Sequence, residues 1–349
     1  MWKGAVLARD SHARRVTVAD IAAAAGVSRA TVSKVLNGRS DVAAETRALI
    51  ARLLDEREYV PTKRTKGTPL AAGGGLIEML FNDAATPWAV EMIRGTEETA
   101  RAARAGVVVS TLGGGSNPGQ RWVEDVARRR SRGLILALSQ LSAGDQRLIA
   151  KLGVPAILVD PVGDVDTDFP SIGSDNWGGG MAATRHLIEL GHQRIGTIAG
   201  PLRFLCSQAR LAGYRAALER AGIPADERLI APGDFHYRAA YESALALLDL
   251  ADPPTAIFAA NDEQALAVYA AAHQRGLRIP EHLSVIGFDD VPMSQWVTPP
   301  LTTVRQPITE LAALATRTVL DGGDLGGGLP GRVELPTTLV VRGSTARRP

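Results

Sequence analysis

The strongest constraint on the fold is a regular alternation of short apolar runs and amphipathic helical segments, which begins at residue 76. Alternation of this kind predicts parallel sheets with right-handed crossover connections. Seven β-α units, then a helix near 308–320 and a strand near 339–341, are too many for one small sheet, so we expect two α/β lobes. The expected strands are 76–81, 106–111, 133–137, 156–159, 194–199, 256–259 and 283–288, with helices between them such as 87–105 and 181–190.

Residues 1–60 follow a different pattern, which predicts a small all-α domain. Helices are expected at 18–25, 29–36 and 44–58. Gly26 supplies a turn between the first two helices, and Ser28 stands where it caps the second. This arrangement is that of a helix-turn-helix. Residues 61–75, with Lys and Arg followed by Pro69 and a run of glycines, are expected to form a hinge or linker.

Charge is distributed unevenly between these parts. Residues 1–66 carry a net charge of +6, whereas the whole chain carries +2. A basic head on a slightly acidic body fits a polyanionic partner for the head, and an ordinary solvated surface is the alternative interpretation.

Several classes of protein are disfavoured by composition. Cys206 is the only cysteine and the six histidines lack ligand spacing, so we expect no disulfide framework, no metal and no cofactor. No apolar run reaches about 18 residues, which predicts no membrane span. The N-terminal residues do not resemble a signal peptide, and the expected location is therefore the cytoplasm.

The most specific motif is TVADIAAAAGVSRATVSKVLNG at residues 17–38. Val18 and Ile21 on the first helix should point inward, and the second helix should be held by its own apolar side chains, Val32, Val35 and Leu36. Its open face would present Arg29, Ala30, Ser33 and Lys34, as a recognition helix does to the major groove. The motif resembles the head of the lac-repressor (LacI) family of transcription regulators, and the downstream segments Val42-x-x-x-Thr46-Arg47 and Tyr59-x-Pro61 extend the match.

The resemblance implies two kinds of DNA contact. Bases would be read by Arg29, Ala30 and Lys34. Phosphates would be contacted by Thr17, Ser28, Thr31, Ser33 and Asn37. The family's hinge helix carries a leucine that enters the minor groove, but here Thr68 stands between Gly67 and Pro69. Lys63 and Arg64 are therefore expected to bind phosphates instead. The alternative is a three-helix packing module without DNA contacts.

The rest of the chain resembles the family's effector domain, a two-lobed fold like that of periplasmic binding proteins. The resemblance rests on ordered segments, which are Thr184-x-His-Leu-x-x-Leu-Gly-His192, Ala199-Gly-Pro, Arg210-x-x-Gly-Tyr, Ala260-Asn-Asp262, Val285-Ile-Gly-Phe-Asp289-Asp290 and Pro299-Pro-Leu-Thr-Thr303-Val-x-Gln306. It implies one domain over 76–342. The N-lobe would take 76–172 and 303–332, and the C-lobe 173–302 and 333–342.

The same resemblance implies a ligand cleft between the lobes. Its polar positions map onto Asp160, Arg210, Asn261 and Asp289, which suit the hydroxyl groups of a sugar. Asn82 follows the first strand, and Phe235 and Trp88 would offer aromatic faces. The alternative is that Asp289 and Asp262 cap helices or turns and that the aromatic residues belong to the core. Trp177 and Trp296 fit either interlobe packing or the cleft.

These features predict a repressor whose operator affinity is controlled by a small carbohydrate. Residues 81–95 resemble a xylose or xylo-oligosaccharide subgroup of actinobacterial members. A nucleoside or purine effector and a sugar-binding protein without regulatory role are the alternatives. An enzyme is disfavoured because no G-x-S-x-G and no phosphate loop after the first strand is present. A homodimer on an inverted-repeat operator is expected. The chain ends soon after the last strand, so assembly beyond a dimer is not expected.

Overall fold

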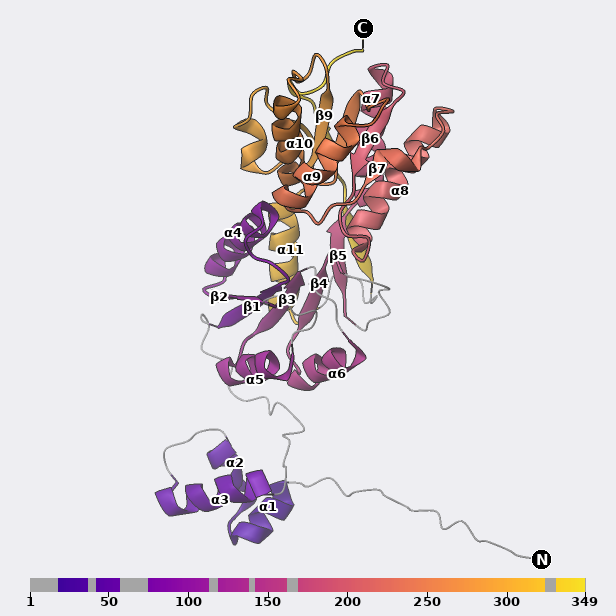
Figure 1. Ribbon diagram of the computed structural model, residues 1–349. Coiled ribbons are helices and arrows are strands. Elements are labelled where there is room, and N and C mark those ends of the chain that lie inside the picture. The colour runs from indigo at the N-terminus through magenta and orange to yellow at the C-terminus, as the bar shows by residue number, and fades with distance from the viewer. Residues whose placement is uncertain are drawn as a thin grey trace, which may run out of the picture. The chain divides into compact units, whose positions relative to one another are not determined.

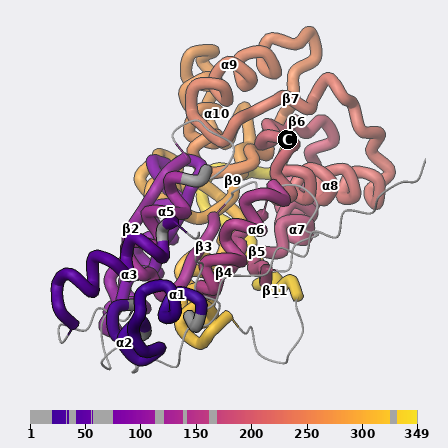
Figure 2. Tube along the Cα trace, turned by 90° about the horizontal axis from the view of Figure 1, so that it is seen from below, coloured from indigo at the N-terminus to yellow at the C-terminus, as the bar shows by residue number. Residues whose placement is uncertain are grey.

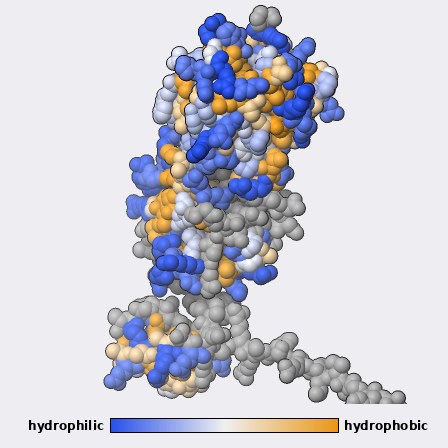
Figure 3. All heavy atoms as spheres, viewed as in Figure 1, coloured by the Kyte–Doolittle hydropathy of each residue, from blue (hydrophilic) through white to orange (hydrophobic). Residues whose placement is uncertain are grey.

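The computed structural model describes residues 18–36, 42–56, 75–112, 119–137, 142–161, 169–323 and 331–348. The chain divides into two compact units, Met1–Pro69 and Leu70–Pro349 (Figure 1). No helix in the described ranges is long and apolar enough to cross a membrane. Hydrophilic and hydrophobic residues are interspersed over the face of the larger unit that Figure 3 presents.

The small unit contains the three predicted helices, α1 (Val18–Ala25), α2 (Arg29–Leu36) and α3 (Ala44–Glu56); residues 57 and 58, also expected in the third helix, lie outside the described residues. Ile21, Val32 and Ile50 are fully buried and tie the three helices together. Gly26 has φ of +66°, a left-handed conformation that glycine adopts without strain. The Ser28 hydroxyl accepts a hydrogen bond from the amide of Thr31 at 3.1 Å, which is the expected cap of α2.

The first lobe of the large unit is built on a parallel six-stranded sheet of order β11-β5-β4-β3-β1-β2. Its strands are β1 (Leu76–Phe81), β2 (Gly106–Thr111), β3 (Gly133–Ala137), β4 (Ala156–Val159), β5 (Ser171–Ser174) and β11 (Arg332–Leu335). Helices α4 (Pro87–Ala102) and α11 (Ile308–Leu320) cover one face, and α5 (Gly119–Arg129) and α6 (Ala143–Leu152) cover the other (Figure 1). Successive strand side chains point to opposite faces, so Met79 packs beneath α4 and Leu80 beneath α5 and α6.

The second lobe has a six-stranded sheet of order β12-β10-β9-β8-β6-β7, parallel except for the antiparallel β12. Its strands are β6 (Ile195–Ile198), β7 (Ile230–Ala231), β8 (Ala256–Ala259), β9 (Ser284–Asp289), β10 (Thr302–Arg305) and β12 (Thr338–Val340). Helices α7 (Asn176–Glu189) and α8 (Leu205–Arg220) lie side by side on one face (Figure 2), with α9 (Tyr237–Leu248) and α10 (Asp262–Gln274) on the other. Two short 3-10 helices, Glu227–Leu229 and Pro292–Gln295, complete it. The predicted two-lobed α/β architecture is confirmed.

The chain passes between the sheets three times, after β5, β10 and β11. Each of these strands continues two or three residues beyond the lobe boundary that we expected from the sequence, because β10 lies wholly in the second sheet and β11 in the first. Pro307 and Pro336 follow β10 and β11 closely. Proline donates no ladder hydrogen bond, which explains why neither strand continues past it.

Candidate functional site

A polar cleft lies where the two lobes meet. It is lined by Thr86, Trp88, Asp160, Cys206, Arg210, Phe235, Asn261, Asp289 and Gln306. Six of the seven predicted ligand residues are therefore brought together, and Asn82 is not among the lining residues. The cavity has a volume of about 50 Å³, whereas one water molecule takes about 30 Å³ in the liquid. A larger molecule requires the lining to move.

Arg210, on α8, is the best-anchored group in the cleft. Its Nε donates to the Asn176 side-chain oxygen at 2.8 Å, and Nη1 donates to the Ala260 carbonyl at 2.5 Å. Nη1 also lies 3.8 Å from a carboxylate oxygen of Asp289, and the guanidinium stacks 3.8 Å from the centre of the Phe288 ring. These contacts fix a planar cation whose orientation suits forked hydrogen bonds to paired oxygens.

Two buried carboxylates flank this cation. Burial raises the pKa of the Asp289 carboxyl to about 6, and the positive charge of Arg210 opposes that rise. Gln306 donates to Asp289 Oδ1 at 2.6 Å. Burial also raises the pKa of Asp160, again opposed by Arg210, and Oδ1 of Asp160 is buried without a hydrogen-bond partner.

Buried polar atoms without partners gather around the cleft. Besides Asp160 Oδ1, they include Gln306 Oε1 in the lining and the hydroxyl of Ser207, which follows Cys206. Buried polar groups in proteins are nearly always hydrogen-bonded, so such atoms indicate an unfilled need for water or ligand. The arrangement suits a molecule that donates several hydrogen bonds.

Backbone strain is concentrated at the same place. Among the described residues, six other than glycine have positive φ, namely Arg104, Arg130, Asp160, Phe235, Asp289 and Asp290. The two arginines follow helices, whereas the other four line the cleft or, in the case of Asp290, adjoin it. Strained backbone of this kind is typical of binding sites that hold side chains in fixed directions.

The alternative interpretation, in which polar residues such as Asp262 cap helices or turns, applies in part to Asp262 and to its neighbour Asn261. Asn261 caps α10 by accepting from the amide of Gln264 at 2.9 Å, and its amide group donates to the Phe235 carbonyl at 2.9 Å. Asp262 is fully buried and accepts from the Val291 amide at 2.9 Å and the Thr303 hydroxyl at 2.5 Å. Asp262 therefore braces the loop after β9, while Asn261 both caps a helix and faces the cleft.

The aromatic residues separate into two groups. Trp88 is buried and meets Phe81 edge to face at 6.4 Å, and Phe235 stacks on Phe204 at 5.9 Å. Trp177 and Trp296 are exposed and lie outside the cleft lining. Among the described residues, Trp88 and Phe235 are thus the aromatic side chains that line the cleft.

Thr86, Cys206 and Gln306 line the cleft but were not predicted as site residues. Gln306 closes the Pro299–Gln306 motif, which was the available sequence signal. Thr86 caps α4 through its hydroxyl, and Cys206 belongs to the first turn of α8. Their position in the cleft follows from packing between segments far apart in the sequence.

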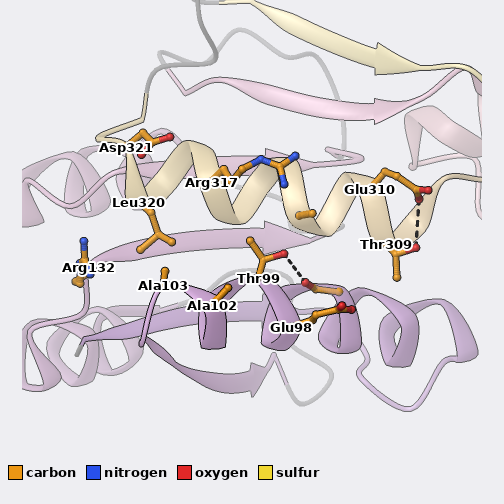
Figure 4. Close-up of a pocket in the computed structure, with 12 residues that line it drawn as sticks. Glu98, Thr99, Ala102, Ala103, Arg132, Thr309, Glu310, Arg317, Leu320 and Asp321 are labelled. Atoms are coloured by element: carbon orange, nitrogen blue, oxygen red, sulfur yellow. Dashed lines mark hydrogen bonds between the residues drawn. The ribbon is translucent and has the colours of Figure 1, made fainter. Parts of the chain in front are cut away.

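A larger groove of about 860 Å³ lies between α4 and α11 on the first lobe, as Figure 4 shows. Its walls carry Glu98, Arg132, Glu310 and Arg317 together with several alanines. In the described part of the chain, none of the buried polar atoms without a partner belongs to this groove. The smaller cleft, with its anchored cation and paired carboxylates, is therefore the candidate ligand site.

In the small unit, the predicted base-reading residues Arg29, Ala30 and Lys34 are exposed on α2. Ser28 is exposed and Thr31 half-buried, with their hydroxyls 2.9 Å apart. Ser33 lies in the same helix. The remaining predicted DNA contacts, Thr17, Asn37, Lys63 and Arg64, lie outside the described residues.

A helix-turn-helix with a basic exposed face, joined to two lobes around a polar cleft, defines a DNA-binding regulator with a small-molecule domain. The description of bacterial regulatory proteins of the lacI family matches residues 17–62, and that of the periplasmic binding protein-like domain matches residues 184–345. The chain belongs to the lacI family. It is a transcriptional regulator and not an enzyme.

The chain is similar along nearly its whole length to characterised members. It is 32% identical to the HTH-type transcriptional repressor CytR of Escherichia coli K12, with 95% of this chain and 97% of that one covered. It is 33% identical to the ribose operon repressor of the same organism, with 86% and 90% covered. Among solved structures, the CelR–cellobiose complex has a TM-score of 0.70 at 32% identity, covering 95% of this chain and all of that one. The lac repressor dimer bound to operator and the anti-inducer ONPF has a TM-score of 0.69 at 30% identity, with the same coverage.

Proposed function

We propose that this regulator binds a small carbohydrate in the cleft between its lobes and that the carbohydrate changes its affinity for operator DNA. The observation that carries the proposal is the convergence of Arg210, Asp160 and Asp289 on one buried, incompletely hydrogen-bonded space. Relatives named for ribose and a solved complex with cellobiose support a sugar.

In this proposal each lining residue has a chemical role. Arg210 donates to two adjacent hydroxyls, Asp160 and Asp289 accept from hydroxyls, and Asn261 contributes its amide. Trp88 and Phe235 cover the apolar faces of the ring. Asn82, outside the present lining, would reach the ligand only after the cleft rearranges.

The head is proposed to bind DNA as part of a homodimer, with two copies of α2 in successive major grooves of an inverted repeat. The dimeric lac repressor on its operator supports this arrangement. Arg29, Ala30 and Lys34 would read bases. Phosphate contacts would come from Thr17, Ser28, Thr31, Ser33, Asn37, Lys63 and Arg64. Such a regulator acts on DNA in the cytoplasm.

The test is a thermal-shift screen of the full chain with ribose, xylose, xylobiose, cellobiose, cytidine and adenosine. A ligand that binds only the folded state raises the melting temperature, because it stabilises by RT ln(1 + [L]/Kd). Stabilisation by a sugar, lost in Asp289→Ala, is the expected result, and a preference for xylose or xylobiose would support the narrower xylose-type effector suggested by residues 81–95. Stabilisation by nucleosides alone, or a response that Asp289→Ala retains, would overturn the proposal.

A further inference from the structure

A charged contact joins the two lobes beside the cleft, away from the three chain crossings. His236 Nε2 of the second lobe lies 3.6 Å from Asp83 Oδ2 of the first lobe. Each residue adjoins the lining, since His236 follows Phe235 and Asp83 lies three residues before Thr86. Both side chains are nearly half exposed, at 44% and 47%, which places the contact at the rim of the cleft.

A second carboxylate of the described residues also faces the His236 ring. Its Nδ1 lies 3.8 Å from Oε1 of Glu263, at the start of α10. Asp234 accepts from the backbone amide of His236 at 2.9 Å. The nearby cation Arg238 is strongly exposed and pairs with Glu242 on α9.

The two carboxylates that face the imidazole are held in place by the backbone. Asp83 Oδ1 accepts from the amide of Ala85 at 2.8 Å, and Glu263 Oε1 accepts from the amide of Tyr237 at 2.9 Å. The remaining carboxylate oxygen of Asp83 is thereby aimed across the gap between the lobes. Little side-chain entropy is left to lose when the imidazole sits between them.

We propose that protonated His236 forms an ion pair with Asp83 across the rim and that this ion pair holds the cleft closed in the absence of effector. Opening the lobes separates His236 from Asp83 while Glu263, on the same lobe as His236, stays beside it. The open state therefore loses one of two carboxylate partners. The contact is an ion pair only while the imidazole is protonated, so closure is favoured as the pH falls. This device goes beyond effector recognition, because it acts on the lobes whatever the cleft binds.

The chain provides its own reporter of cleft opening. Cys206 is the only cysteine, is 4% exposed and lines the cleft. Burial raises the pKa of its thiol to about 11, so the closed cleft both shields the thiol and keeps it protonated. The rate at which a pyridyl disulfide labels Cys206 under native conditions therefore follows the fraction of open cleft.

The experiment compares labelling rates of the full-length protein, His236→Gln and Asp83→Asn at pH 6 and pH 8, each divided by the rate of the same protein in urea. Taking the ratio of variant to wild type at each pH cancels the ionisation of the thiol itself. Glu242→Gln, which breaks the exposed pair on α9 without touching the other lobe, is the matched control. No effector or operator is needed, so the result stands apart from that of the ligand screen.

Both rim variants should label about two- to five-fold faster than wild type at pH 6, the range expected for a partly exposed ion pair. The ratio should fall to about one at pH 8, and the double variant should be no faster than either single one. Glu242→Gln should match wild type at both pH values. Equal rates for His236→Gln and wild type at pH 6, a ratio that does not change with pH, or an effect of only one rim variant would overturn the proposal.

Discussion

Asp289→Asn should make the effector-free protein more stable at neutral pH, because the native carboxylate is buried at a cost. Burial moves the pKa of Asp289 from 3.8 to about 6, and a pKa difference of one between folded and unfolded protein corresponds to about 1.4 kcal/mol. The cost of ionising this group in the fold is therefore about 3 kcal/mol above pH 6. Asparagine keeps the shape and accepts from Gln306 but carries no charge, so it removes most of that cost.

The direction in which the free energy of unfolding changes with pH follows from proton linkage. Between pH 3.8 and 6 the folded protein holds a proton on Asp289 that the unfolded chain has lost, so the free energy of unfolding falls as pH rises through this window. The stability gained by Asp289→Asn should accordingly be small at pH 4.5, grow through pH 6 and level off by pH 7.5. Melting of the two-lobed unit at these three pH values measures it.

The neighbouring residue provides the control. Asp290 is as buried as Asp289 but forms ion pairs with Arg305 at 2.7 Å and Arg342 at 2.6 Å. Asp290→Asn removes the negative charge that is paired with the partly buried Arg342 and should therefore destabilise at pH 7. The reasoning is refuted if Asp289→Asn lowers the melting temperature at pH 7.5, or if its effect is the same at all three pH values.

Four other substitutions test the head and the cleft separately. Arg29→Ala should cost about 1–3 kcal/mol on the preferred operator and less on random DNA, whereas Lys63→Ala should weaken both about equally; gel shifts on the two DNAs that gave identical patterns for both variants would contradict this. Ser28→Ala removes the hydrogen bond to the first turn of α2 and should lower the free energy of unfolding of the head by about 1 kcal/mol, measured by urea titration of circular dichroism. Gly200→Ala would press a methyl group against both the Phe235 ring and the Ser207 hydroxyl, so effector affinity measured by calorimetry should fall, and unchanged affinity would show that neither side chain contacts the effector.

Most of the fold could be predicted because the central strands are continuous apolar runs. The residues of β3 and β4 are buried on both faces of a parallel sheet. Such strands consist of apolar residues, which can be recognised in the sequence. Strands β5, β10 and β11 read SIGS, TTVR and RVEL and were not predicted. Their strand structure comes from neighbours far away in the sequence, which no local pattern records.

The site was predictable to a similar extent and for a related reason. Polar residues at the ends of buried strands, such as Asp160 after β4 and Asp289 at the end of β9, stand out against their surroundings. Cys206 and Gln306 do not, because only the meeting of two lobes places them beside Arg210. Asn82 was predicted because it follows β1, where the family resemblance implies a ligand contact, but it is not among the lining residues.

The remaining prediction concerns the coupling between effector and operator. The cleft is narrow, with a volume of about 50 Å³, so we expect effector binding to change the arrangement of the lining or of the lobes. If that change alters operator affinity by some factor, the operator must alter effector affinity by the same factor, because both describe one coupling free energy. Operator affinity with and without saturating effector, and effector affinity with and without operator, should give equal factors.

In Asp289→Ala, effector affinity should fall by a few kcal/mol, since a buried hydrogen-bonding group is left unpaired. Its operator affinity without effector should match wild type, because Asp289 belongs to the larger unit and not to the head. Its operator affinity at saturating effector should also match wild type, because the substitution changes how much effector is needed and leaves the bound state in place. A variant that binds effector normally would remove Asp289 from the site. Unequal factors in the wild type would show that effector and operator do not act on one shared equilibrium.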